Sequence, residues 1–421
     1  MYRAAVAGLI VAALAIRIAF VLATPDYQLI HDAIDYDRHA ASIASGHGFA
    51  LSYGRPTAFR PPAYPIFVAG VYELVGYADK AARVEAARIA NAFVGTGIVA
   101  LIGLIAFQLW GRRVALIALG LGAIYIPLIL VGQSVMSEPL FVLCLLGAIA
   151  AVLHSRRYPW VIGAGVLMGL AILGRANAIV LLLPLALAVR GSGWRAPVVL
   201  VVAAALTVAP WTIRNYETFD AFVPVSTQFG SALAGTYNSE ARADKVNPAS
   251  WRTLKRVDDY RPIFNQIRST PEPVLEKRLR EASVDFIKEH PAYVGTVAFW
   301  TTRRMLDLAG MDWSIHTAAT ISATRGPAIA GVICFWIYAL LAVVGAFRAR
   351  GTPLWLWSVP LLMYLSVVFL VVETPRYRTA IDPFIVLLAA LALDALRKNS
   401  RTPADRRLPG EDRARSAVAG G

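Results

Sequence analysis

Two short segments near the N-terminus carry acidic and basic side chains whose types suit chemistry on a phosphate. Asp32 and Asp35 lie in HDAIDY, directly after the first apolar stretch, and Arg60 opens the later segment RPPAYP. A carboxylate near lipid is a candidate general base, because desolvation and nearby cations both move its pKa. Guanidinium is the natural bidentate partner of phosphate. The pair indicates transfer of a group from a lipid phosphate, although both aspartates would also serve as helix N-caps.

Further candidates lie at the ends of later apolar segments. Glu138 opens one in SVMSEPLF. There it is either stabilised by the helix dipole or acts as a second acid that binds acceptor hydroxyls, positions Asp32 or holds a metal. With Arg60, the candidate phosphate ligands are Arg214 in PWTIRNY and the pair in ETPRYR, Arg376 and Arg378. Secondary candidates for the site are Asp35, Tyr36 and Tyr377. Two further arginines, Arg17 and Arg175, are expected to snorkel to the membrane surface or to pair with an acid.

A metal site is an open alternative for the same acidic segment. His31, His39 and His47 lie within it. A zinc site needs a cluster of ligands that is already formed, whereas His39 is more simply a helix-surface partner of Asp35. We therefore predict no cofactor firmly and leave a divalent cation open.

The composition is that of a membrane protein. Of the 421 residues, 57% are hydrophobic and 16% are charged, against about 25% charged in soluble domains. Long apolar runs must form spanning helices, because lipid satisfies no backbone polar group. The net charge of +14 does not indicate a nucleic-acid partner, since the basic residues lie in loops between the apolar runs.

The apolar runs predict an all-α polytopic membrane protein with about ten spans of roughly 20 residues each. They are expected near Ala4–Ala23, Ile89–Trp110, Val114–Val131, Pro139–His154, Trp160–Leu173, Ala178–Val189, Val198–Ile213, Ala328–Phe347, Leu354–Val372 and Ile381–Leu396.

Arginine and lysine in alternate short loops predict that both termini are cytoplasmic, in the cell (inner) membrane. Two large loops then face outside, at about residues 25–88 and 214–327. The candidate phosphate ligands also fall on this outer side, where the positive-inside rule would not place ordinary anchors. Residues 1–397 form the expected membrane domain, and the basic tail, residues 398–421, is expected to be disordered.

Both outer loops are expected to hold interfacial helices. In the first loop this is Asp35–Ser45, which ends before glycines, and a second apolar stretch, Ala63–Val75, is too short to span. In the second loop, an apolar stripe that begins at Leu275 predicts an amphipathic helix that stops near Pro291.

In this order, the motifs resemble the GT-C superfamily of membrane glycosyltransferases, in particular its ArnT-like and protein-mannosyltransferase-like (family 39) group. The matching segments cover most of the membrane portion: HDAIDYDRHAASIASGHGF, PTAFRPPAYPIFVAG, SVMSEPLF, GLAILGRANA, PWTIRNYETFDAFVPVST and ETPRYRTAIDPF. The resemblance implies an enzyme that takes a sugar, a hexose or a pentose, from a polyprenyl-phosphate carrier on the extracytoplasmic face. By the same resemblance, Asp32 is the catalytic acidic residue, Arg60 faces the lipid phosphate, Glu138 is the acid that opens the fourth span, and the last span matches at Arg376 and Arg378.

We therefore predict a glycosyltransferase that works by a single inverting displacement, with Asp32 as base and a lipid, glycan or protein as acceptor. A polytopic transporter or lipid flippase without covalent chemistry is the alternative, and a catalytically silent membrane scaffold is a third. Transporters tend to show internal repeats around a site at mid-membrane. Here the charged candidates gather at one face, which favours the enzyme.

Overall fold

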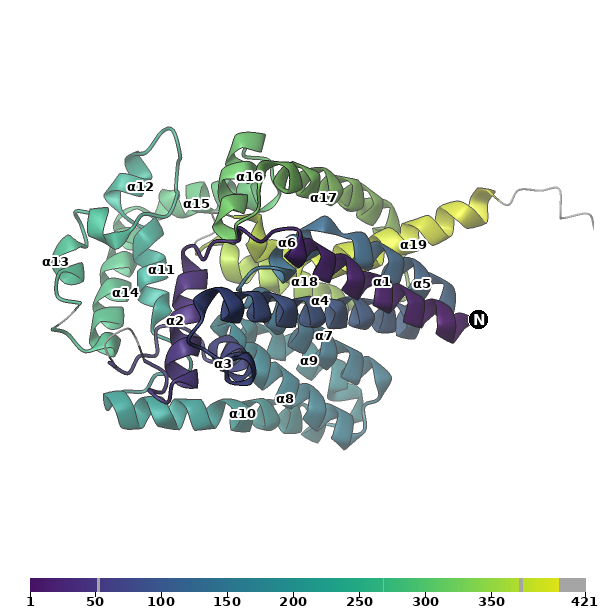
Figure 1. Cartoon of the computed structure of the whole chain (residues 1–421), viewed down its shortest axis with the longest axis horizontal. Helices are drawn as coiled ribbons and strands as arrows, with labels where there is room; N and C mark the ends of the chain where they lie inside the picture. The colour runs from purple at the N-terminus through teal and green to yellow at the C-terminus, as the bar shows by residue number, and fades with distance from the viewer. Residues whose placement is uncertain (51–53, 268, 371–373, 401–421) are drawn as a thin grey trace, which may run out of the picture.

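The computed structural model describes residues 1–50, 54–267, 269–370 and 374–400 (Figure 1). Within these ranges the chain is mostly helical, and its β-pairing is limited to an isolated bridge between Ala50 and Pro56. The long apolar helices run roughly along one axis, and shorter helices gather at one end of the molecule (Figure 1). The start of α1 and the end of α19 lie at the opposite end (Figure 1). The start of α1 and the end of α19 are thus at the same end, whereas the side of the membrane on which they lie stays a prediction.

Each of the ten apolar runs of the sequence is helical over most of its described residues, and the last two residues of the run Leu354–Val372 lie outside the described part of the chain. The helices are α1 (Tyr2–Leu22), α4 (Lys80–Trp110), α5 (Arg112–Ile124) with α6 (Ile126–Gly132), α7 (Glu138–His154), α8 (Tyr158–Gly174), η1 (Ala176–Leu181) with α9 (Leu182–Val189) and η2 (Arg190–Ser192), α10 (Arg195–Phe219), α17 (Arg325–Ala346), α18 (Leu354–Val368) and α19 (Asp382–Ser400). Among the described residues, four helices are long and apolar enough to cross a membrane, α1, α4, α10 and α17, or five if α5 and α6 form one span. The expected positions are thus confirmed, whereas several helices are shorter than a simple span.

The third expected span, Val114–Val131, is not one straight helix. It breaks at Tyr125 into α5 and α6, which are bent by 56°. Pro127 lies in the first turn of α6, where it has no N–H to donate and its ring disfavours a continuous helix. The break frees carbonyls at the end of α5, and Arg17 donates to two of them, at Gly122 (3.2 Å) and Ala123 (3.3 Å). Arg17 therefore binds backbone oxygen atoms inside the bundle.

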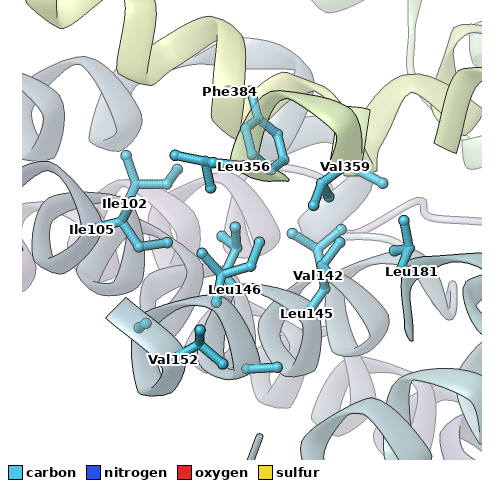
Figure 2. Packing of buried hydrophobic residues seen from close by; sticks show 14 of the residues in the cluster. Ile102, Ile105, Val142, Leu145, Leu146, Val152, Leu181, Leu356, Val359 and Phe384 are labelled. Carbon is cyan, nitrogen blue, oxygen red and sulfur yellow. The ribbon is translucent and has the colours of Figure 1, made fainter. Parts of the chain in front are cut away.

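Helix α7 lies at the centre of the main apolar core. Figure 2 shows side chains of α4, η1, α18 and α19 around Val142, Leu145 and Leu146 of α7. Helices α8 and α10 pack closely against each other through small residues, as is common between membrane helices. A Cβ atom at Gly165 would lie 2.5 Å from the carbonyl oxygen of Leu200. This packing holds α7, α8 and α10 next to one another.

The two large loops form a helical cap at the end of the bundle (Figure 1). The first loop holds α2 (Asp32–Ala44) and α3 (Ala63–Val75), close to the expected bounds. Their buried faces form a second apolar cluster with α4 and α6. The long loop holds α11 (Gln228–Thr236), α12 (Ser239–Ala243), η3 (Leu254–Arg256), α13 (Arg261–Phe264), α14 (Glu272–Glu289), α15 (Pro291–Met305), α16 (Met311–Ala318) and η4 (Ala319–Ile321), and η5 (Pro375–Ala380) follows α18.

The expected disordered tail, residues 398–421, is described only as far as Ser400. Helix α19 continues to Ser400, so the tail expected from residue 398 begins inside a helix. The remainder of that tail, residues 401–421, lies outside the described residues.

Candidate functional site

Five segments that are distant in the sequence meet where the outer loops join the bundle. Asp32 is the first residue of α2, and Arg60 lies just before α3. Glu138 opens α7, Arg175 directly follows α8, and Arg376 lies in η5, whose N-cap Thr374 accepts a hydrogen bond from the Arg376 amide. Each charged side chain thus comes from a helix end, which places the cluster at the rim of the apolar core.

Asp32 lies between two guanidinium groups. Arg60 Nη2 donates to Asp32 Oδ1 at 2.7 Å, and Arg376 Nη2 donates to the other oxygen, Asp32 Oδ2. Burial favours the neutral acid, but the positive charges and hydrogen bonds of Arg60 and Arg376 outweigh it and hold the pKa of Asp32 well below its usual range. Asp32 is therefore ionised at neutral pH.

Glu138 forms the second acidic centre of the cluster. Arg175 Nη1 lies 2.8 Å from Glu138 Oε1, and Arg376 Nε lies 3.6 Å from the same oxygen. Arg376 therefore joins the two acids. The other carboxylate oxygen, Glu138 Oε2, is buried and has no hydrogen-bond partner among the described residues. Its capacity to accept a hydrogen bond is thus unused among the described residues.

The secondary candidates, Asp35, Tyr36 and Tyr377, contact the charged cluster in different ways. Asp35 Oδ2 accepts from Arg60 Nη2 at 2.6 Å and from Arg60 Nε at 3.2 Å. Tyr36 pairs its hydroxyl with Ser137 at 3.0 Å, and the ring of Tyr377 lies within 5.2 Å of the guanidinium carbons of Arg175 and Arg376. Burial raises the pKa of Tyr36, so this hydroxyl stays protonated at neutral pH.

A cavity of about 160 Å³ opens onto these charges. Its walls come from the first loop, the ends of α7 and α8, the long loop, α18 and η5, and the charged side chains among them are Asp32, Arg60, Glu138, Arg175 and Arg376. Asp35 pairs with Arg60 but is not among the lining residues. The walls therefore present two carboxylates and three guanidinium groups, an arrangement that can bind a phosphate and a polar group beside it.

Two of the predicted phosphate ligands lie outside this cavity. Arg214 donates to the carbonyl oxygens of Thr57 (2.8 Å) and Phe49 (3.0 Å) in the first loop. Arg378 is buried, pairs with Asp382 (2.9 Å) and Asp307 (3.0 Å), and lines a second cavity of about 60 Å³, which Arg376 also lines. In a 3₁₀-helix such as η5, each residue is rotated by about 120° from the one before it, so residues two positions apart differ by about 240° around the helix axis. Arg376 and Arg378 therefore point in different directions although only Tyr377 separates them.

The structure adds residues that the sequence reasoning ranked low or missed. Arg175 was expected only to snorkel or to pair with an acid, and it pairs with Glu138 at the cavity wall. Its position just after an apolar run, on the same side as Glu138, was the available signal. Residues of the long loop that also line the cavity, Ser226, Gln228 and Phe229, carry no charge and gave no signal.

The histidines of the first loop are dispersed. His39 Nδ1 contacts the carbonyl oxygen of Asp35 at 2.5 Å, and His47 Nδ1 contacts Ser45 Oγ at 2.9 Å. Across the part of the chain that the structure describes, no three side chains of His, Cys, Asp or Glu are grouped closely enough to hold a metal ion.

Comparison with solved structures shows what this architecture is similar to. The oligosaccharyltransferase AglB from Archaeoglobus fulgidus, in complex with an inhibitory peptide and a dolichol-phosphate, matches with a TM-score of 0.51 and 12% identity, over 97% of this chain and 54% of that one. The apo form of an oligosaccharyltransferase from the same organism gives a TM-score of 0.53 and 11% identity, over 93% and 50% of the two chains. The chain has the GT-C fold. The all-α polytopic architecture predicted from the sequence is thereby confirmed.

The likeness to these solved structures is limited to the fold. The chain spans about half the length of the oligosaccharyltransferase chains that it matches. ArnT from Cupriavidus metallidurans bound to undecaprenyl phosphate gives a TM-score of 0.44 and 16% identity, over 94% of this chain and 79% of that one. No family model matches the sequence, and no curated protein matches it at a significant level.

Proposed function

We propose that this GT-C protein is a glycosyltransferase that moves a sugar from a polyprenyl-phosphate donor to an acceptor hydroxyl on the extracytoplasmic face of the membrane. The observation that carries the proposal is the cavity in which Asp32 and Glu138 face Arg60, Arg175 and Arg376. The solved AglB complex contains a dolichol-phosphate, a ligand of the same chemical class. A lipid, a glycan or a protein could supply the acceptor hydroxyl.

In this proposal Arg60 and Arg376 bind the donor phosphate. Both side chains are largely buried, at 7% and 9% exposure, and both reach the cavity. Fixed donors in a site that excludes water stabilise developing negative charge more strongly than solvent does. They would therefore favour departure of the phosphate when the bond from the sugar to its oxygen breaks.

Asp32 is the proposed base. The acceptor oxygen attacks the anomeric carbon from the side opposite the phosphate, its proton passes to Asp32, and the electron pair of the breaking bond leaves with the phosphate. The configuration at the anomeric carbon is inverted. In the free protein the two arginines keep Asp32 ionised. A bound phosphate would share their positive charge, so the basicity of Asp32 would rise when donor is present.

Glu138 is proposed to hold a sugar or acceptor hydroxyl through Oε2, the buried oxygen that no described residue satisfies. Burying such an oxygen without a partner costs free energy. A ligand hydroxyl that donates to it would recover that cost and orient the ligand.

The donor's lipid chain has a matching apolar groove beside the charges. A cavity of about 490 Å³ lies between α3, α7, α8 and α10, and its lining is mostly apolar. Pro61 lines the charged cavity and Pro62 the groove, while Gly174 lines the former and Leu173 the latter. The linings of the two cavities are therefore adjacent in two chain segments, which supports a headgroup in one and an isoprenoid chain in the other.

The experiment compares Asp32→Asn with Asp35→Asn in purified protein. Both changes remove a carboxylate from α2 that pairs with Arg60, but only Asp32 lines the cavity. General bases contribute about 10²–10⁴-fold to rate, so Asp32→Asn should lower sugar transfer by that factor and Asp35→Asn by less than about tenfold. Transfer by Asp32→Asn within about threefold of wild type would disprove the assignment of the base. Counterflow of the lipid-linked sugar in liposomes without covalent product would favour a transporter.

A further inference from the structure

Glu272, the first residue of α14, connects the long loop to the first loop. Its carboxylate accepts hydrogen bonds from the Thr57 hydroxyl (2.6 Å), from the Ala58 amide (2.9 Å) and from the Thr227 hydroxyl. Hydrogen bonds to a charged acceptor are about twice as strong as neutral ones. We call this set, Glu272 with Thr57, Ala58 and Thr227, the Glu272 clasp.

Further bonds fix the same short segment of the first loop. The Thr227 amide donates to the Ala58 carbonyl at 3.0 Å, and Arg214 donates to the Thr57 carbonyl at 2.8 Å. Thr57 and Ala58 are both fully buried, at 0% exposure. Ala58 thus has its amide and its carbonyl bound by the long loop, which leaves this stretch of backbone little freedom.

The clasp lies at the junction of two walls of the charged cavity. On one side, Arg60 and Pro61 line the cavity directly after the clasped segment. On the other, Ser226 and Gln228 line it, and they flank Thr227 in the chain. Glu272 itself is not a lining residue. A change at Glu272 would therefore reach a ligand through the position of the walls.

We propose that Glu272 is a positioning residue that holds Arg60 at the donor phosphate and keeps the two walls closed against water, an inference that rests on the proposed glycosyl transfer. A displacement of about 1 Å at a reacting group can lower rate by about 10². A wall that opens also admits water. Water would then attack the anomeric carbon in place of the acceptor, give its proton to Asp32 and release free sugar and lipid phosphate.

The first test needs no substrate. Amide hydrogen exchange over residues 54–64 is measured in wild type, Glu272→Ala and Glu281→Ala. Glu281 is a matched control, because it is an exposed acid on the same helix whose partner is Lys277 at 3.9 Å. We expect faster exchange in this segment for Glu272→Ala only, since the Ala58 amide loses its acceptor. Unchanged exchange in Glu272→Ala would overturn the clasp itself.

The second test separates positioning from general destabilisation. Transfer and hydrolysis of a polyprenyl-phosphate sugar are measured together for Thr57→Val, which removes the hydroxyl that reaches Glu272, and for Thr57→Ser, which keeps it. These variants serve also if Glu272→Ala does not fold. We expect Thr57→Val to lower kcat for transfer about tenfold or more and to raise the ratio of hydrolysis to transfer. In Thr57→Ser, kcat for transfer and the ratio of hydrolysis to transfer should both stay close to their wild-type values.

The outcomes distinguish the two proposals. Wild-type protein that neither transfers nor hydrolyses the sugar, with Glu272→Ala showing faster exchange, would refute the proposed function and leave the clasp. Wild-type protein that transfers sugar, with a ratio of hydrolysis to transfer unchanged in Thr57→Val, would refute the positioning role and leave the function.

Discussion

Replacement of Arg376 by methionine tests whether the positive charge of this side chain stabilises the departing phosphate, as proposed. Arg376 is 9% exposed, donates to Asp32 Oδ2 and lies 3.6 Å from Glu138. Methionine is flexible and fills irregular space, so it removes the charge with little loss of packing. The substitution leaves Asp32 paired with Arg60 and Glu138 paired with Arg175.

The expected loss of transfer rate follows from the number of hydrogen-bond donors that the substitution removes. Removal of one preorganised donor at a developing oxyanion costs about 2.7–4 kcal/mol, or about 10²–10³ in rate. We therefore expect Arg376→Met to lower kcat/KM for sugar transfer by about 10²–10³. Removal of one partner of a buried ion pair also destabilises a fold by about 3–5 kcal/mol, so rates must be corrected for the folded fraction.

The pH profile of the same variant has a predicted sign. Arg376 favours ionised Asp32, so its removal raises the pKa of Asp32. A base must be ionised to act, and kcat/KM reports groups of the free enzyme. In wild type, protonation of Asp32 should not limit kcat/KM at or above about pH 4, near the ordinary pKa of an aspartate. In Arg376→Met the acid limb should move to higher pH.

Arg378→Met is the matched control for both readouts. Arg378 is also buried and paired with two acids, Asp382 and Asp307, but it does not line the charged cavity. It should lower the midpoint of thermal unfolding as Arg376→Met does, without moving the acid limb. If Arg376→Met retained kcat/KM within about fivefold of wild type and kept the wild-type acid limb, the electrostatic reasoning would be refuted.

Two further predictions concern the neighbours of the charged cavity. Arg175→Met leaves Glu138 with Arg376 at 3.6 Å as its remaining ion-pair partner, and it should destabilise the fold by about 3–5 kcal/mol. Thermal unfolding in detergent measures this, and an unchanged midpoint would contradict it. Leu170→Trp partly fills the apolar groove and should raise KM about tenfold, roughly 1.4 kcal/mol, for a long-chain donor but not for a short-chain one. Leu183→Trp, at an exposed site outside the groove, is the control, and equal effects on both donors would speak against the groove.

The sequence predicted the fold because membrane helices obey a strong rule. Lipid satisfies no backbone polar group, so long apolar runs such as Ile89–Trp110 must be helical, and the structure has α4 there. The same rule does not predict a break inside a run. At Tyr125 the bend depends on Pro127 together with Arg17, a residue more than 100 positions away that binds the freed carbonyls.

The candidate site was predictable to the extent that its residues lie at helix ends. Asp32, Arg60, Glu138 and Arg376 could be assigned to one side of the membrane from topology, and the structure brings them together. Topology does not specify the direction of a side chain. Arg378 is on the same short helix as Arg376 but turns to Asp382.

The long loop shows a second limit of the same kind. Its amphipathic helix was predictable from the stripe at Leu275, since the period of apolar residues shows which face is buried. The contact of Glu272 with Thr57 was not, because it joins residues 215 positions apart through loop geometry. Arg214 was predicted as a phosphate ligand, and its bonds to loop carbonyls depend on that same geometry.

Donor binding in the charged cavity is tested most directly by an experimentally determined structure of this protein with polyprenyl phosphate bound. We expect a phosphate within hydrogen-bonding distance of Arg60 and Arg376, beside Asp32, with the isoprenoid chain in the groove between α3, α7, α8 and α10. A phosphate bound instead at Arg214 or Arg378, with the charged cavity empty, would contradict it.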